Sequence, residues 1–419
     1  RPPRSTQSRS SAASDVYKRQ NKVCKETPLV LNERLSKLVG ASVLLKREDL
    51  QQIRSFKIRG AFNKIASLTN DECKKGIVCA SAGNHAQGFA LACKQLKIHG
   101  VVYMPATTPQ QKIAQVAMFG GSFVKIELTG DTYDACQKVA IKVAHENNKI
   151  LIHSFDDLKV IEGQATIALE MLAQNKETFD YIIVPIGGGG LISGIITVFK
   201  ELSPSTKIIG VEPEGASSMK FAMDRGECVA LNEMDPFVDG AAVKKVGDLP
   251  YAICKESLDK IITVPEGKIC QSILDLYNIE GIVAEPAGAL AISALDILGE
   301  ELRGGSIGVL LCGGNNDILR MPEIKERALL YANLKHYFLV QFPQRAGSLK
   351  QFVSEILGPN DDITYFEFSK KSFRPNTTAL VGIEVSQVTD YQRLVDSMKS
   401  HNFKFDYLNN KQSLFEFLI

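Results

Sequence analysis

The sequence has almost no excess charge and no long apolar run. Lysine and arginine number 49 against 47 aspartates and glutamates, which leaves a formal net charge of +2. A bulk electrostatic attraction to nucleic acid or to an anionic membrane surface is therefore not expected. No apolar stretch is long enough to span a bilayer, so we predict neither nucleic acid nor a membrane as a partner.

Metal-binding and disulfide patterns are also missing. The six histidines are scattered and never reach the spacing of metal ligands, so we predict no metal site. The nine cysteines are odd in number and form no CxxC pair. This usage favours reduced, mostly buried thiols, and hence a cytoplasmic protein.

The rest of the composition is typical of a globular protein. The chain has 419 residues, of which 45% are hydrophobic and 23% charged, and this length suits two or three domains. Residues 1–20 differ from the rest because they are rich in arginine and serine, hold a single acid, Asp15, and show no periodicity. We interpret them as a disordered or non-native tail and exclude them from the fold.

Short apolar runs alternate with helical patterns from about residue 28 onwards. The segments GIVCASAGNHAQGFALACKQL (76–96) and DYIIVPIGGGGLISGIITVFKEL (180–202) each predict a strand, a glycine-containing loop and a helix. Continuous valine and isoleucine runs separated by helices indicate a parallel sheet buried on both faces. We therefore predict an α/β fold, in which ligands bind at the carboxyl ends of the strands.

The pattern changes after residue 330. Residues 335–419 predict the order strand, helix, strand, strand, helix, strand, which is that of a ferredoxin-like α+β module. The module is small enough to be an appended domain and shows no nucleophile–base arrangement. Regulation or oligomerisation therefore suits it better than catalysis, and a dimerisation domain is its simpler interpretation.

The most specific local motif is IGGGGLISG, in which Gly187, Gly188, Gly189 and Gly190 separate a strand from a helix. Four consecutive glycines lose backbone entropy on folding, and they make sense where backbone N–H groups must approach an anion at a helix N-terminus. The loop is not GxxxxGK[ST], so a nucleoside-triphosphate P-loop is not predicted. A phosphate group is the ligand that this motif favours, whereas an ordinary tight turn needs only one or two glycines.

The stretch QQIRSFKIRGAFNK (51–64) places Lys57 between Phe56 and Ile58 and close to other cations. One interpretation is an amphipathic helix whose lysine reaches water. The other is chemical: desolvation and nearby positive charge disfavour the ammonium form, which leaves an amine able to form a Schiff base. This stretch alone leaves both interpretations open.

Two further loops carry polar groups at predicted strand ends. In SAGNHAQG (81–88), Ser81 and Asn84 are placed to bind a carboxylate or a ring hydroxyl, although helix capping is the simpler interpretation. In LLCGGNND (310–317), Cys312 ends a strand and, taken alone, suggests only a small buried side chain.

Together these features suit one cofactor, pyridoxal phosphate. Its aldehyde needs an amine, its phosphate an anion-binding loop, its ring hydroxyl an amide, and its ring nitrogen a hydrogen-bonding group. The sequence supplies Lys57, Gly187–Gly190, Asn84 and Cys312 for these four needs.

At this point the chain resembles a known family, the fold-type II pyridoxal-phosphate enzymes, and most closely the biosynthetic threonine ammonia-lyases. The resemblance covers nearly everything from about residue 24 to 419, and the ordered set of motifs is far more specific than any one of them. The matching segments are TPL (27–29), KREDLQQIRSFKIRGA, SAGNHAQG, the tetraglycine loop, GVEPEGA, EPAGA, CGGNND and the C-terminal FPQRAGSLKQFV.

The resemblance implies a fold and a domain organisation. Residues 21–330 would form a two-subdomain catalytic core like that of the tryptophan synthase β subunit, with the small subdomain at about 50–150. Residues 335–419 would form an ACT-like regulatory domain.

The resemblance also assigns residues. Lys57 would form the Schiff base and then act as the base at the substrate α-carbon, while Phe56 packs against the cofactor ring and Asn84 binds its hydroxyl. The phosphate would lie in the loop Gly187, Gly188, Gly189, Gly190 and Leu191. The substrate carboxylate would be bound by Ser81, Gly83, Asn84 and His85. Glu285 in EPAGA would line the cofactor pocket without transferring a proton.

Three positions depart from relatives. Cys312 stands where many relatives have a serine facing the ring nitrogen, and a thiol is the weaker hydrogen-bonding group. Ala82 stands where serine racemases have a second serine that acts as acid and base, which favours elimination over racemisation. Ser218 replaces a carboxylate of the racemases' cation site, so although Glu212 is present we predict no metal.

The implied function is pyridoxal-phosphate-dependent deamination of L-threonine to 2-oxobutanoate and ammonia, the first step of isoleucine biosynthesis. Serine would be a poorer substrate, isoleucine a feedback inhibitor, and the protein a homodimer or homotetramer. One alternative is a serine dehydratase, a serine racemase or another fold-type II enzyme. An alternative of another class is a catalytically inactive protein that senses an amino acid through residues 335–419.

Overall fold

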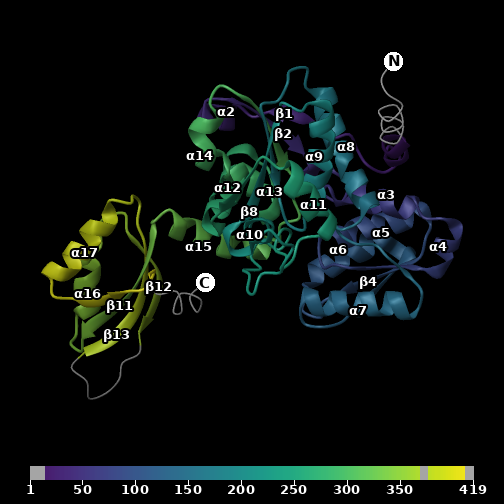
Figure 1. The fold of residues 1–419 in the computed structure, drawn as a ribbon. Coiled ribbons are helices and arrows are strands. Elements are labelled where there is room, and N and C mark those ends of the chain that lie inside the picture. The colour runs from purple at the N-terminus through teal and green to yellow at the C-terminus, as the bar shows by residue number, and fades with distance from the viewer. Residues whose placement is uncertain (1–14, 369–375, 411–419) are drawn as a thin grey trace. The chain divides into compact units, whose positions relative to one another are not determined.

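The structure is a computed structural model that describes residues 15–368 and 376–410 (Figure 1). Its contacts divide the chain into two compact units. Of the described residues, the larger unit comprises 15–266 and 276–316, and the smaller one 267–275, 317–368 and 376–410.

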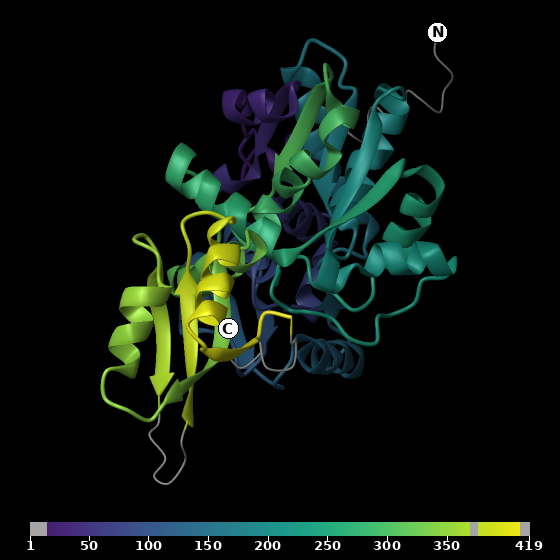
Figure 2. The ribbon, with the colours of Figure 1, turned by 90° about the vertical axis from the view of Figure 1, so that its left-hand side faces the viewer.

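The larger unit is built around a six-stranded sheet. Its strand order is β1 (Leu29–Leu31), β2 (Ser42–Arg47), β10 (Ser306–Leu311), β7 (Tyr181–Pro185), β8 (Lys207–Pro213) and β9 (Lys260–Val264). Only β1 is antiparallel to its neighbour. The central strands are almost wholly buried because helices lie on both sides of the sheet, as Figure 2 shows. The predicted parallel sheet of an α/β fold is thereby confirmed.

Helices connect the strands of this sheet. They are α2 (Glu33–Val39), α8 (Leu158–Gln174), α9 (Gly190–Leu202), α10 (Ser218–Arg225), α11 (Asp248–Ser257), α12 (Glu266–Glu280), α13 (Pro286–Ser293) and α14 (Leu295–Leu298). Short 3₁₀ turns add η1 (Glu48–Leu50), η3 (Glu214–Ala216) and η4 (Gly299–Leu302), whereas η5 (Ile318–Arg320) belongs to the smaller unit.

A second parallel sheet belongs to the same unit. Its order is β5 (Val124–Leu128), β4 (Gly100–Met104), β3 (Ile77–Ala80) and β6 (Ile150–Leu151). Its helices are α3 (Lys57–Ala66), α4 (Asn70–Lys75), α5 (Asn84–Leu96), α6 (Gln110–Gly120) and α7 (Tyr133–Glu146), with the turn η2 (Gly121–Phe123). The core between them is apolar and includes Phe62, Phe89 and Val102. Two parallel sheets in one unit agree with the predicted core of two subdomains.

The smaller unit contains a four-stranded antiparallel sheet in the order β12 (Asp362–Phe368), β13 (Asn376–Glu384), β11 (Lys335–Pro343) and β14 (Lys404–Tyr407). The helix α15 (Met321–Tyr331) precedes it. The helical segment α16 (Ser348–Gln351), continued by η6 (Phe352–Ile356), and the helix α17 (Asp390–Ser400) lie on one side of the sheet in Figure 1. The chain order is therefore β-α-β-β-α-β, which confirms the ferredoxin-like prediction.

The N-terminal prediction differs from the structure at its boundary. Residues 15–20 are helical, and Gln20 is only 2% exposed. Its side-chain amide donates to the backbone carbonyl oxygens of Arg59 and Gly163. A buried amide with these partners is part of the fold, so the predicted tail does not extend to residue 20, while residues 1–14 lie outside the described part of the chain.

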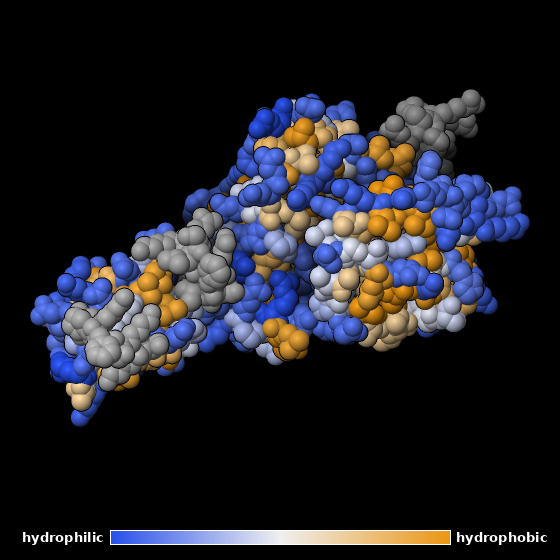
Figure 3. All heavy atoms as spheres, turned by 90° about the horizontal axis from the view of Figure 1, so that it is seen from below, coloured by the Kyte–Doolittle hydropathy of each residue, from blue (hydrophilic) through white to orange (hydrophobic). Residues whose placement is uncertain are grey.

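The surface seen in Figure 3 mixes hydrophilic side chains with several separate hydrophobic clusters. Across residues 15–368 and 376–410, no helix has both the length and the apolar composition that a membrane crossing requires.

Candidate active site

The tetraglycine loop follows β7 and leads directly into α9, at the carboxyl edge of the six-stranded sheet. It leaves no room for side chains: a Cβ atom on Gly188 would lie 2.2 Å from the Phe155 ring, and one on Gly187 would lie 2.9 Å from Ala241. Gly189 has a φ of 90°, which favours glycine. The loop therefore presents bare backbone N–H groups at the start of a helix, which is a site for an anion.

Lys57 is the first residue of α3 and is half-buried. Its Nζ donates to the backbone oxygen of Ser154 at 3.2 Å and lies 5.2 Å from the centre of the Phe56 ring. Burial lowers the pKa of Lys57 from 10.5 to about 8, although the nearby Cys312 and Glu285 act in the opposite direction. The burial of the amine favours the chemical interpretation of this stretch, in which Lys57 is an amine able to form a Schiff base. The apolar surroundings of the amine disfavour its charged ammonium form.

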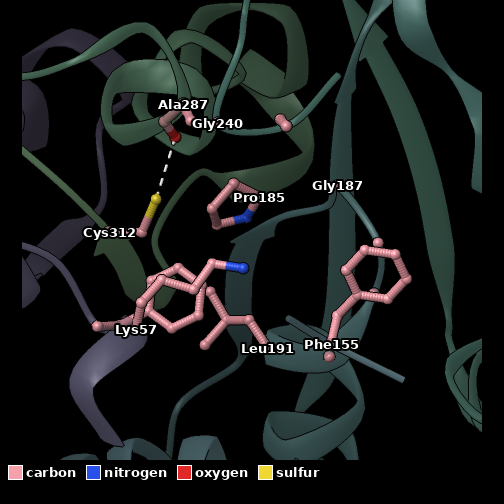
Figure 4. A pocket seen from close by; sticks show the side chains of 13 residues that line it. Lys57, Phe155, Pro185, Gly187, Leu191, Gly240, Ala287 and Cys312 are labelled. Carbon is pink, nitrogen blue, oxygen red and sulfur yellow. Dashed lines mark hydrogen bonds between the residues drawn. The ribbon is translucent and has the colours of Figure 1, made fainter. Parts of the chain in front are cut away.

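Lys57 and the glycine loop line one small cavity (Figure 4). The amine of Lys57 points into the space between Cys312 and the Gly187 segment. The remaining lining includes Phe56, Gly188, Gly189, Gly190, Leu191, Phe155, Pro185, Gly240, Ala241 and Ala287. Every residue predicted for the phosphate, the ring face and the ring nitrogen is therefore brought together here.

A second, larger cavity of about 270 Å³ adjoins the first. The residues that line both are Phe56, Lys57, Phe155, Gly188, Gly240, Ala287 and Cys312. The loop between β3 and α5 forms another part of its wall. The residues of this loop that line it are Ser81, Ala82, Gly83, Asn84 and His85. The helix α5 begins at Asn84 after a glycine, which has no side chain to cap it, so its first N–H groups suit a carboxylate.

His85 is deeply buried, and its Nε2 lies 3.0 Å from the backbone oxygen of Ile152. Because a carbonyl oxygen only accepts, Nε2 must carry the proton in this contact. Burial and the nearby Lys57 lower the pKa of His85 to about 3. This side chain is therefore a neutral imidazole rather than a cation that would attract the carboxylate by charge.

Asn84 joins three of the sequence motifs. Its Nδ2 donates to Glu285 at 2.5 Å, and its Oδ1 accepts from Asn315 at 2.7 Å. Burial raises the pKa of Glu285 to about 7, even though the amide of Asn84 stabilises the carboxylate. One N–H of Asn84 is left for a ligand, so the amide is oriented before any ligand arrives.

Glu212 was singled out as a possible cation ligand, and its contacts are with the backbone. Its carboxylate accepts from the N–H groups of Met219 and Lys220 at 2.7 Å and 2.8 Å, at the start of α10. No group of three or more His, Cys, Asp or Glu side chains placed to hold a metal ion occurs among residues 15–368 and 376–410.

Comparison with known proteins agrees with this geometry. Residues 21–313 match the family described as pyridoxal-phosphate dependent enzyme, and residues 326–418 match the C-terminal regulatory domain of threonine dehydratase. The biosynthetic L-threonine dehydratase IlvA of Halalkalibacterium halodurans is 50% identical over 94% of this chain and 95% of its own length. The chain belongs to the biosynthetic threonine dehydratases. It is a pyridoxal-phosphate-dependent ammonia-lyase.

Solved structures of threonine dehydratases, also called threonine deaminases, have the same fold. The processed form of isoform 2 from Solanum lycopersicum has a TM-score of 0.72 and 39% identity, covering 76% of this chain and 88% of that chain. The threonine deaminase of T.th. has a TM-score of 0.68 and 35% identity, covering 74% of this chain and 98% of that chain.

The cavity of this dehydratase fits pyridoxal phosphate. The glycine loop is a cradle that any Cβ atom would fill, and it suits the phosphate group. Lys57 offers an amine of lowered pKa to the aldehyde, and Phe56 lies beside it. Asn84 retains one N–H for the ring hydroxyl.

Cys312 lies in the same cavity, and its described hydrogen bond is to the protein backbone. Its Sγ–H donates to the backbone oxygen of Ala287 at 3.2 Å. Burial raises the pKa of the Cys312 thiol well above its usual range, which keeps it protonated. Its hydrogen is therefore directed at a carbonyl, and the contact with the ring nitrogen stays a prediction.

The sequence interpretation missed the segment after β6. Ser154 accepts the hydrogen bond of Lys57, and Phe155 packs against Gly188. Tyr133, at the start of α7, lines the larger cavity. The signal was available, because HSFDD (153–157) directly follows the short apolar run of a strand and so falls at the carboxyl edge of a sheet.

Proposed function

We propose that this threonine dehydratase eliminates water from L-threonine at the junction of the two cavities. The observation that carries the proposal is the position of Lys57, whose amine of lowered pKa lies in the wall shared by the glycine loop and the α5 loop. Pyridoxal phosphate, when bound, supplies the electron withdrawal that makes the substrate α-carbon acidic.

The side chains then have distinct tasks. Lys57 takes the α-proton on its Nζ, as a neutral amine of lowered pKa is suited to do. The Ser81 hydroxyl and the backbone N–H groups of Gly83, Asn84 and His85 hold the substrate carboxylate, since the ring N–H of neutral His85 is donated to Ile152. Loss of the α-proton and of the β-hydroxyl as water leaves an enamine, whose hydrolysis gives 2-oxobutanoate and ammonia.

Ala82 favours elimination over racemisation. It lines the larger cavity beside Ser81 and Gly83, and its methyl group has no proton to give or take. With a base on only one side of the substrate α-carbon, racemisation lacks the acid that would return a proton from the opposite side. This is the observation that separates the proposal from a serine racemase on the same fold.

The product of the purified holoenzyme tests the proposal. We expect 2-oxobutanoate and ammonia in equal amounts from L-threonine, a lower kcat/KM for L-serine with pyruvate as product, and no D-serine. Chromatography of the 2-oxo acids and chiral analysis of the remaining serine measure all three. D-serine formation at a rate comparable to pyruvate would contradict the one-sided mechanism, and a protein inactive toward both amino acids would favour the sensing alternative.

We further propose that the catalytic domain, predicted at 21–330, also includes the helical residues 15–20, that its small subdomain covers about 50–150, and that residues 335–419 form an ACT-like regulatory domain. The sheet β5-β4-β3-β6 and its helices support the first range, and the β-α-β-β-α-β unit supports the second. We also propose that the protein is a homodimer or homotetramer and that it is cytoplasmic. Buried thiols such as Cys79 and Cys93 favour the cytoplasmic location.

Isoleucine is the proposed effector of the regulatory domain. We expect L-isoleucine to lower activity at subsaturating threonine and to lose this effect as threonine rises, because an effector acts through its differential affinity for two states. Initial rates across a matrix of both concentrations measure the coupling. D-isoleucine is the matched control, since it is the enantiomer of L-isoleucine and has the same hydrophobicity. Equal rates with and without L-isoleucine would reject the proposal.

A further inference from the structure

Four buried charges lie behind the helix that begins at Lys57, and we call them the buried quartet. Arg59 donates to Glu48 at 2.7 Å and 2.9 Å and to Glu170 at 2.6 Å and 2.8 Å. Lys46 donates to Glu170 at 2.6 Å. The side chains are at most 2% exposed, and their formal charges cancel.

The quartet holds the first turn of α3 from the side opposite Lys57. Residues two apart on a helix point about 200° away from each other, so Arg59 points away from the cavity that Lys57 enters. The backbone of this turn is also pressed against α8, since a Cβ atom on Gly163 would lie 2.6 Å from the Arg59 carbonyl oxygen. The start of α3 is therefore fixed by charge pairs and by close backbone contact.

The N-terminal segment closes this arrangement. Gln20 donates through Nε2 to the carbonyl oxygens of Arg59 at 2.7 Å and Gly163 at 3.1 Å, which lie on the two helices where they meet. Its Oε1 accepts from Thr166 on α8 at 2.8 Å. In Figure 1 the segment runs beside α3 and α8.

The same segment covers the quartet itself. The carbonyl oxygen of Lys25 accepts from Arg59 at 3.3 Å, and the Thr27 hydroxyl donates to Glu48 at 2.5 Å. We call residues 20–27 the N-terminal strap. Because it excludes water from the quartet, it keeps the charge pairs in a medium of low dielectric constant, where they hold their geometry most firmly.

We propose that Gln20 is a positioning residue of the reaction, which acts through the Arg59 turn to hold Lys57 at its place in the cavity wall. The inference rests on the proposed role of Lys57. It gives the N-terminal strap a catalytic consequence although none of its residues lines either cavity. A displacement of a reacting group by about 1 Å can lower a rate by about a hundredfold, so loosening the turn is expected to affect kcat first.

The test compares Gln20→Leu, Thr166→Val and the control Lys22→Ala, which changes an exposed residue of the strap. We expect Gln20→Leu to lower kcat by about tenfold or more with KM for threonine changed less than about twofold, because the substrate loop is untouched. Thr166→Val removes the hydroxyl that donates to Gln20 and that also accepts from Arg59 at 3.2 Å, with little change in side-chain shape, and it should act in the same direction more weakly. Lys22→Ala should leave kcat and KM unchanged.

A second readout reports on Lys57 without cofactor. The rate at which an acylating reagent labels Lys57 in the cofactor-free protein, followed by peptide mass spectrometry against pH, gives its pKa. Loosening the turn admits water, so the midpoint should rise in Gln20→Leu from about 8 toward the ordinary 10.5. The pKa of Lys57 should rise rather than fall because water stabilises the ammonium form.

Each result decides the inference. A lower kcat together with a raised labelling midpoint in Gln20→Leu supports the positioning role of Gln20. If Gln20→Leu does not fold, the same two measurements are made on Thr166→Val. A lower melting temperature with unchanged kcat per folded molecule and an unchanged midpoint would overturn it, because Gln20 would then only stabilise the fold. If Lys57→Ala keeps its activity, the proposed function fails instead, whatever Gln20 does.

Discussion

Lys57→Ala is expected to lose at least about a thousandfold in kcat and to lose the visible absorbance of the holoenzyme. In the proposed mechanism the substitution removes both the amine that would bond the cofactor aldehyde and the base that would take the α-proton, and a positioned base alone contributes about a hundred- to ten-thousandfold. The fold should survive, because Lys57 is half-buried and its one described hydrogen bond is to the Ser154 carbonyl. Absorbance spectra and 2-oxobutanoate release measure the two losses.

Lys64→Ala is the matched control, since Lys64 lies on the same helix and pairs with Asp157 at 2.7 Å away from both cavities. It should retain the absorbance and nearly all of the activity. A Lys57→Ala protein that still absorbs in the visible range would show that another group holds the cofactor. A wild-type protein that stays colourless and inactive with added pyridoxal phosphate would favour the sensing alternative.

Arg59→Met is expected to lower the free energy of unfolding by about 3–5 kcal/mol, which is the usual effect of removing one partner of a buried ion pair. The reason is the charge balance of the buried quartet: two glutamates would face Lys46 alone. Arg59 opposes the effect of burial on Glu48 and lowers the pKa of that carboxyl, so in its absence Glu48 is a buried charge with a weaker partner. Urea unfolding of the full chain, followed at the first transition, measures the change.

Two further variants make the Arg59 prediction specific. Arg59→Met combined with Glu48→Gln restores a neutral cluster and should recover part of the stability. Arg303→Met breaks a mostly exposed pair with Glu300 and should change stability by less than about 1 kcal/mol. Equal effects of the two arginine variants would mean that the quartet contributes no more than a surface pair.

Much of the fold follows from local patterns. The period of apolar residues and the glycine loops predicted the strand–helix units of the larger unit and the β-α-β-β-α-β order of the smaller one. The glycine loop was predictable for the same reason: a phosphate cradle needs residues without a Cβ atom, and Gly187–Gly190 show this in the sequence itself. Lys57, in contrast, had two interpretations in its own stretch, because its burial depends on Ser154 and Phe155, about a hundred residues further along the chain.

The long-range pairings were decided only by the tertiary structure. Gln20 meets partners 39 and 143 residues away, Asn84 is oriented by Glu285 201 residues away, and Cys312 donates to Ala287, 25 residues earlier in the chain. Nothing in an arginine- and serine-rich stretch reveals that its last residue bridges two helices. Backbone strain and apolar period are properties of a few neighbouring residues, whereas the satisfaction of a buried polar group depends on which distant segments the packed core brings beside it.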